Sequence, residues 1–146
     1  MNETQVTITG NVATSVEYRN SASGAPMARF RLASTIRRFD RGRGSWADAY
    51  TNFYTVLAWR SLASNLTSSI TLGEPVIVIG QLKVVEKDVD GKRFISADIM
   101  ASSVGHDLNR GTSAFARIVQ AHQNVLGEPG NGFAGTPDMD QLVPSQ

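Results

Sequence analysis

Cysteine is absent from this 146-residue chain, which excludes disulfide bonds and thiol nucleophiles. No apolar run approaches the roughly 18 residues that a membrane-spanning helix needs. The opening residues MNETQVTITG contain neither the basic nor the apolar segment of a secretory signal. We therefore expect a cytoplasmic protein without a membrane partner.

Catalytic and metal-binding motifs are also scarce. His106 and His122 are the only histidines, and without cysteine they do not indicate a structural zinc site. His106-Asp107 has no nucleophile or paired carboxylate beside it, which favours a turn or capping role. Residues 130–135 match the string G-x-G-x-x-G, but no strand precedes them and no helix follows. We expect no enzyme activity, no metal and no cofactor.

The net charge of +1 conceals an uneven distribution. Residues 1–127 hold all 14 basic residues against 10 acids, which gives +4. Residues 128–146 hold three acids and no base, which gives −3. Local charge density sets the field that a ligand meets, so the first segment is the one suited to an anionic partner.

Arginine and aromatic residues concentrate in residues 29–60. Seven of the eleven arginines and seven of the eleven aromatic residues fall there, against only two acids. Guanidinium groups pair with phosphates and stack on rings, and aromatic faces stack on unpaired bases. The stretch favours a surface for single-stranded nucleic acid. The alternative is that the aromatic side chains are strand core and the arginines a solvated face.

Side chains alternate between the two faces of a strand. Within 28–39 the even-numbered positions suit a core, whereas the odd-numbered ones carry arginine and Phe39. Within 51–59 the odd-numbered positions include Phe53 and Trp59. We predict that the odd-numbered side chains form a binding face, although a bulge in either strand would shift the alternation.

Residues 1–110 are predicted to form one domain with a helix over Arg60–Ser69. Asn20–Pro26 is predicted to be a loop, Asp90-Gly91 a hairpin turn, and Asp40–Asp48 a flexible connection that exposes Trp46. The predicted strands are Thr4–Val12, Ala28–Phe39, Ala49–Trp59, Pro75–Lys87 and Arg93–Val104.

The order strand-strand-strand-helix-strand-strand predicts an all-β fold, a five-stranded OB-fold barrel with one helix between strands 3 and 4. Such barrels bind oligonucleotides or oligosaccharides on the strand 2–3 face, where the arginine and aromatic residues fall. A small β-sandwich would also accept five strands but would not explain the position of the helix. Residues 111–127 are predicted to form a short amphipathic helix, and residues 128–146 a disordered tail.

The chain resembles bacterial single-stranded DNA-binding proteins, most closely the short second paralogue of actinobacteria. The resemblance covers about residues 1–110 and rests on the blocks NETQVTITGNVA, RFRLAST, TNFYTVLAWRSLASN and LGEPVIVIGQLKV. It implies a homotetramer around which single-stranded DNA wraps. Phe53 and Trp59 stand where the family has base-stacking residues, whereas Lys87 stands where many members have a further aromatic.

The composition and the resemblance together predict binding of single-stranded DNA without sequence preference. They also predict which residues contact the DNA. Aromatic side chains would stack on bases. For Trp46 two roles stay open, contact with the ligand and packing within the protein. The predicted stacking residues are Phe39, Phe53, Trp59 and Trp46. The predicted phosphate contacts are Arg29, Arg31, Arg37, Arg41, Arg43, Lys83 and Lys87.

The tail departs from the resemblance. It ends DMDQLVPSQ, without the acidic tip closing in Pro-Phe through which typical members recruit replication and repair enzymes. We therefore expect an accessory role in replication, recombination or repair, at the nucleoid. We do not expect this chain to recruit replication and repair enzymes as typical members of the family do. Two alternatives stay open: an OB-fold module for protein contacts, and an RNA-binding module.

Overall fold

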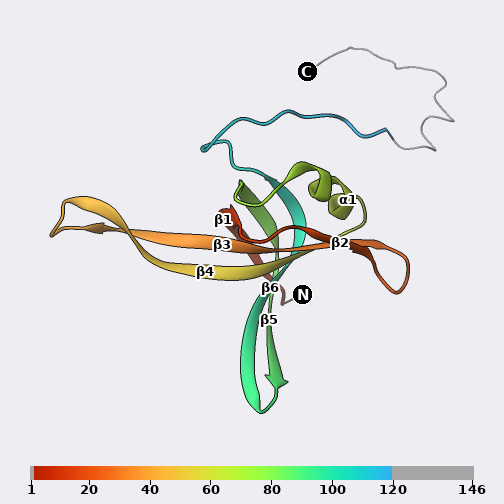
Figure 1. Ribbon diagram of the computed structural model, residues 1–146, viewed down its shortest axis with the longest axis horizontal. Helices are drawn as coiled ribbons and strands as arrows, with labels where there is room; N and C mark the ends of the chain where they lie inside the picture. Colours follow the sequence, from red (N-terminus) through yellow and green to blue (C-terminus); the bar gives the residue numbers. More distant parts are fainter. Residues whose placement is uncertain (1, 120–146) are drawn as a thin grey trace. The chain divides into compact units, whose positions relative to one another are not determined.

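The computed structural model describes residues 2–119, and its strands form a single sheet that closes on itself (Figure 1). Seven elements follow one another along the chain. They are β1 (Thr4–Val12), β2 (Glu17–Asn20), β3 (Pro26–Asp40), β4 (Ser45–Trp59), α1 (Arg60–Ser69), β5 (Pro75–Val89) and β6 (Lys92–His106).

Five strands form the ring, in the order β1-β5-β6-β4-β3, and β1 pairs with β3 to close it. Neighbouring strands are antiparallel except β4 and β6, which are parallel. The predicted five-stranded OB-fold barrel with a helix between its third and fourth strands is confirmed. The helix occupies the predicted residues, and all five predicted strands are present.

β2 is an additional strand that the sequence did not predict. Its four residues, EYRN, are all exposed and show no apolar alternation. It pairs only with the first part of β3, in the register Glu17↔Arg29 to Asn20↔Pro26. β2 therefore pairs with the part of β3 that β1 does not reach. These four residues are extended because β3 lies beside them, and not because of their composition.

The core lies inside the ring and is made by alternate side chains of the strands. Phe30 and Leu32 of β3, Val56 of β4 and Ile99 of β6 are almost fully buried. α1 packs against this core through its buried residues Ala63 and Leu66. The predicted inward direction of the even-numbered positions is thus confirmed where the strands lie in the barrel.

Two long hairpins extend from the ring, β3–β4 to the left and β5–β6 downward in Figure 1. The second hairpin turns at Asp90 and Gly91, whose φ angles of 52° and 78° are those of a two-residue type I′ turn. The predicted turn at this dipeptide is confirmed. Each hairpin carries outward side chains beyond the barrel, so its two faces are both open to solvent.

The prediction of a flexible connection over Asp40–Asp48 was wrong in extent. Only residues 41–44 form the turn, and β4 already begins at Ser45. Asp40 closes the turn tightly, since its Oδ1 accepts hydrogen bonds from the backbone N–H of Gly42 (2.9 Å) and of Arg43 (3.3 Å). Gly44 supplies a φ of 67°, so residues 45–48 return beside the end of β3.

Residues 111–127 were predicted to form an amphipathic helix. Residues 111–119 contain neither helix nor strand, so the described half of that segment is not helical. The remainder of the segment, and the predicted tail 128–146, lie outside the described residues. Across residues 2–119 no helix is long and apolar enough to cross a membrane.

Candidate nucleic-acid interface

The face of β3 and β4 that points away from the core carries the predicted binding residues. Residues directly opposite one another in neighbouring strands point to the same face. Arg29 pairs with Leu57, Arg31 with Thr55, and Ala33 with Phe53. Since the intervening pairs, such as Phe30 with Val56, are buried, this set faces outward.

A β-bulge brings Trp46 onto the same face. Ile36 pairs with Tyr50 but Arg37 pairs with Asp48, so Ala49 has no partner in β3. The alternation in β4 therefore shifts by one residue beyond this point, and Trp46 pairs with Phe39. Their ring centroids lie 5.7 Å apart in an edge-to-face arrangement. Trp46 nevertheless remains 61% exposed, so internal packing leaves most of its surface open.

The outward face continues across β6 and β5. Thr55 of β4 lies beside Asp98 of β6, which lies beside Lys83 of β5. We call the outward side chains of β3, β4, β6 and β5 the outer face. Nine of the eleven predicted site residues belong to it. They are Arg29, Arg31, Arg37, Phe39, Trp46, Phe53, Trp59, Lys83 and Lys87.

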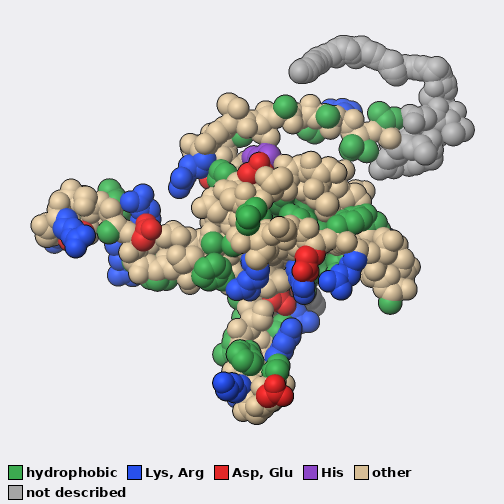
Figure 2. Space-filling model, viewed as in Figure 1, with side chains coloured by type: hydrophobic (Ala, Val, Ile, Leu, Met, Phe, Trp, Pro, Cys, Tyr) green, Lys and Arg blue, Asp and Glu red, His purple; other side chains and the backbone are tan. Residues whose placement is uncertain are grey.

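The other two predicted residues, Arg41 and Arg43, lie in the turn at the tip of the β3–β4 hairpin. They adjoin the end of the outer face, where Phe39 and Trp46 pair. Figure 2 shows Lys and Arg side chains gathered on both hairpins, with hydrophobic side chains among them. The structure thus brings the predicted cations and aromatic rings together along one side of the sheet.

Arg31 and Phe53 form the clearest combination of charge and ring. The Arg31 guanidinium carbon lies 5.7 Å from the centroid of the half-exposed Phe53 ring. Its Nη1 donates a hydrogen bond to Thr55 Oγ1 at 2.9 Å. No acid pairs with Arg31 within residues 2–119, so its charge is available beside an open ring. A stacked base would place its phosphate within reach of that charge.

Other arginines of this region are held by carboxylates. Arg29 donates from Nε to Glu17 at 3.0 Å and from Nη2 to the same oxygen. Arg37 Nε lies 3.3 Å from Asp48 Oδ1. Because exposed ion pairs contribute only about 0–1 kcal/mol, a phosphate can replace these carboxylates at little cost. The same pairs hold the guanidinium groups in place on the face.

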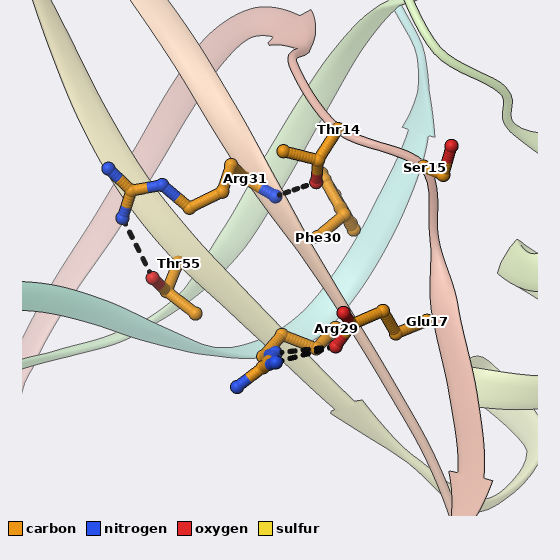
Figure 3. A pocket seen from close by; sticks show the side chains of 7 residues that line it. All are labelled: Thr14, Ser15, Glu17, Arg29, Phe30, Arg31 and Thr55. Carbon is orange, nitrogen blue, oxygen red and sulfur yellow. Dashed lines mark hydrogen bonds and ion pairs between the residues drawn. The ribbon is translucent and has the colours of Figure 1, made fainter.

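A hollow of about 360 Å³ opens between β3 and the β1–β2 connection (Figure 3). Its lining combines hydroxyl groups with two arginines and one acid. Thr14 Oγ1 accepts a hydrogen bond from the Arg31 backbone N–H at 3.0 Å, which fixes the connection against β3. The lining residues are Thr14, Ser15, Glu17, Arg29, Phe30, Arg31 and Thr55.

Three residues were missed from the sequence, two on the outer face and one on the neighbouring strand β2. Phe94 and Lys92 of β6 lie opposite Lys87 and Val89. Counting outward from the Asp90-Gly91 turn would have found both pairings, because a two-residue turn fixes the register of a hairpin. Glu17, the partner of Arg29, had no such signal, since β2 was not predicted. In the described chain, no group of three or more His, Cys, Asp or Glu residues could hold a metal ion.

Comparison with known proteins assigns a family. Residues 3–107 match the Single-strand binding protein family. The chain is 56% identical over 117 residues to single-stranded DNA-binding protein 2 of Streptomyces avermitilis, covering 80% of this chain and 73% of that one. It is 50% identical over 125 residues to single-stranded DNA-binding protein 1 of Streptomyces coelicolor, covering 86% and 80%.

Solved structures show the same likeness. The crystal structure of the small single-stranded DNA-binding protein from Streptomyces coelicolor superposes with a TM-score of 0.70 at 47% identity, covering 76% of this chain and all of that one. The second single-stranded DNA-binding protein of Mycobacterium smegmatis superposes with a TM-score of 0.56 at 27% identity, covering 81% and 99%. The family match over residues 3–107 spans the barrel and its hairpins, the part that carries the outer face.

Proposed function

Because the chain belongs to the single-strand binding protein family, we propose that it binds single-stranded DNA without sequence preference and protects it. The observation that carries this proposal is the outer face, on which open aromatic rings lie among arginine and lysine side chains. Base stacking on such rings contributes roughly 1–3 kcal/mol per base and tolerates any sequence.

The roles follow from exposure and charge. Phe53, Trp59 and the Phe39–Trp46 pair stack on bases, and Arg31 contacts the phosphate of a base stacked on Phe53. The remaining phosphate contacts are Arg37, Arg41, Arg43, Lys83 and Lys87, whereas Arg29 is held by Glu17 and contacts a phosphate only where that ion pair opens. Duplex DNA binds poorly because its bases are already stacked on one another and cannot reach the rings.

The chain acts as a homotetramer, as the family resemblance implies, and sedimentation should give a mass of four chains. It acts where single-stranded DNA is exposed, at the nucleoid in the cytoplasm. Its role in replication, recombination or repair is an accessory one.

Titration of intrinsic tryptophan fluorescence with long oligo-dT tests this function. Trp46 and Trp59 are the only tryptophans, and both lie exposed on the outer face. Oligo-dT should quench their fluorescence, duplex of the same length should not, and added salt should weaken binding. If oligo-dT neither quenches nor is retarded by the protein at low salt, the proposal fails and a protein-interaction module becomes the better explanation. Equal competition by RNA would instead indicate an RNA-binding module.

A further inference from the structure

The β5–β6 hairpin separates its charges between its two faces. The three lysines of the sequence, Lys83, Lys87 and Lys92, all belong to the outer face. The opposite face carries Glu86 and Asp88, each 3.8 Å from the guanidinium of Arg93. One side of the hairpin is therefore cationic, and the other has an acidic pair that one arginine partly neutralises.

Phe94 is the aromatic residue of the cationic side. It lies directly opposite Lys87 and two residues from Lys92 along β6, and 52% of its surface is exposed. Its aliphatic neighbour Ile95, which is 68% exposed, points to the opposite face. The single aromatic ring of the hairpin thus lies beside Lys87 and Lys92, on the face opposite Glu86 and Asp88.

We propose that Phe94 stacks on a base of single-stranded DNA whose phosphates contact Lys87 and Lys92, so that the β5–β6 hairpin is a second stacking site. This inference rests on the proposed function and extends it beyond β3 and β4.

The outer face connects the two stacking sites without interruption. Arg31, Thr55, Asp98 and Lys83 form one row across β3, β4, β6 and β5. With strands spaced by about 4.8 Å, this row spans roughly 14 Å. Asp98 is its only acid, and it accepts a hydrogen bond from Ser96 Oγ at 2.7 Å. A strand leaving Phe53 therefore meets Lys83 and then the Lys87–Phe94 pair.

A protein partner fits this surface less well than a nucleic acid. Lysine is depleted in protein–protein interfaces, whereas here Lys87 and Lys92 flank the ring and Lys83 lies farther along the same face. Lysine ammonium groups and exposed aromatic rings are the two components of single-strand grooves. The lysines show no ion pair with an acid in the described chain, so their charges remain available for phosphates.

The matched variants Phe94→Ala and Ile95→Ala test the site in the full chain. Both remove an exposed apolar side chain from adjacent positions, but only the first lies on the outer face. In fluorescence titration with long oligo-dT, Phe94→Ala should weaken binding about tenfold, or about 1.4 kcal/mol, and Ile95→Ala should leave the affinity unchanged. If the parent protein binds and both variants bind as tightly as the parent, the second stacking site is refuted while the proposed function stands. If the parent does not bind, the proposed function itself fails.

A direct probe places tryptophan at the site. In a Trp46→Phe/Trp59→Phe background, Phe94→Trp should be quenched at saturating oligo-dT, and Ile95→Trp should not. Sedimentation then measures whether Phe94→Ala changes the oligomeric state of the protein. A changed oligomeric state in Phe94→Ala, with the parent state kept in Ile95→Ala, would make Phe94 an interface residue and overturn the inference.

Discussion

Replacing Glu17 by glutamine should tighten DNA binding. Its carboxylate accepts two hydrogen bonds from Arg29, with the Nε bond at 3.0 Å, and lies 3.5 Å from Arg19. It therefore occupies the guanidinium groups that a phosphate would otherwise contact. Glutamine has similar size but no charge, so Arg29 becomes available for the ligand.

The size of the effect follows from counterion release. Each phosphate that a protein binds on a single strand contributes about −0.7 to the slope of log K against log salt concentration. One additional phosphate bound by Arg29 should therefore raise affinity about eightfold near 50 mM salt and only about 1.6-fold near 0.5 M, taking 1 M as the reference. The salt slope should become steeper by about 0.7.

Fluorescence titration with oligo-dT at several salt concentrations measures both quantities. Glu86→Gln is the matched control, because it removes the same charge from the other face of the β5–β6 hairpin, where Glu86 contacts Arg93. Thermal unfolding should shift little in either variant, since exposed ion pairs contribute at most about 1 kcal/mol. Unchanged or weaker binding by Glu17→Gln, or an equal increase in affinity in Glu86→Gln, would refute the competition between Glu17 and phosphate.

Three further predictions concern binding and stability. Replacing Phe53 and Trp59 together by alanine should remove two stacking platforms and weaken oligo-dT binding by about 30-fold or more, with an unchanged circular dichroism spectrum. Gly10→Ala should cost about 1–3 kcal/mol and lower the melting temperature, because its Cβ would lie 2.5 Å from a β3 carbonyl oxygen. The hydrogen bond from His106 lowers the pKa of Glu74, so this stabilisation is present at neutral pH and lost as the pH falls through the folded-state value. Glu74→Gln should melt below the parent at pH 7, and the gap should narrow toward about pH 3, below the usual glutamate pKa of about 4.3.

The barrel was predictable because its signals are local. Alternating apolar residues marked the strands, Asp90-Gly91 marked a turn, and Leu62, Leu66 and Ile70 marked a helix. The missed strand β2 lacks every such signal. Its backbone is extended because β3 lies beside it, and no property of EYRN encodes that neighbour.

The candidate site was predictable in part for the same reason. Alternation placed Arg31 and Phe53 on one face, since both lie in regular stretches of β3 and β4. Trp46 required the bulge at Ala49, which shifts the alternation in β4 and which the apolar pattern does not mark. Phe94 required the pairing of β5 with β6, which relates residues seven positions apart.

The bulge also limits what a sequence alignment can compare. Because Ala49 has no partner in β3, Trp46 lies on the outer face at an even-numbered position, whereas Phe53 of the same strand lies on it at an odd-numbered one. Similarly, positions 87 and 94 lie directly opposite each other, so an aromatic ring at either one would stand on the same patch of the molecule. For such proteins, residues should be matched across relatives by strand register, because a column that has lost its aromatic residue does not show that the surface has lost its ring.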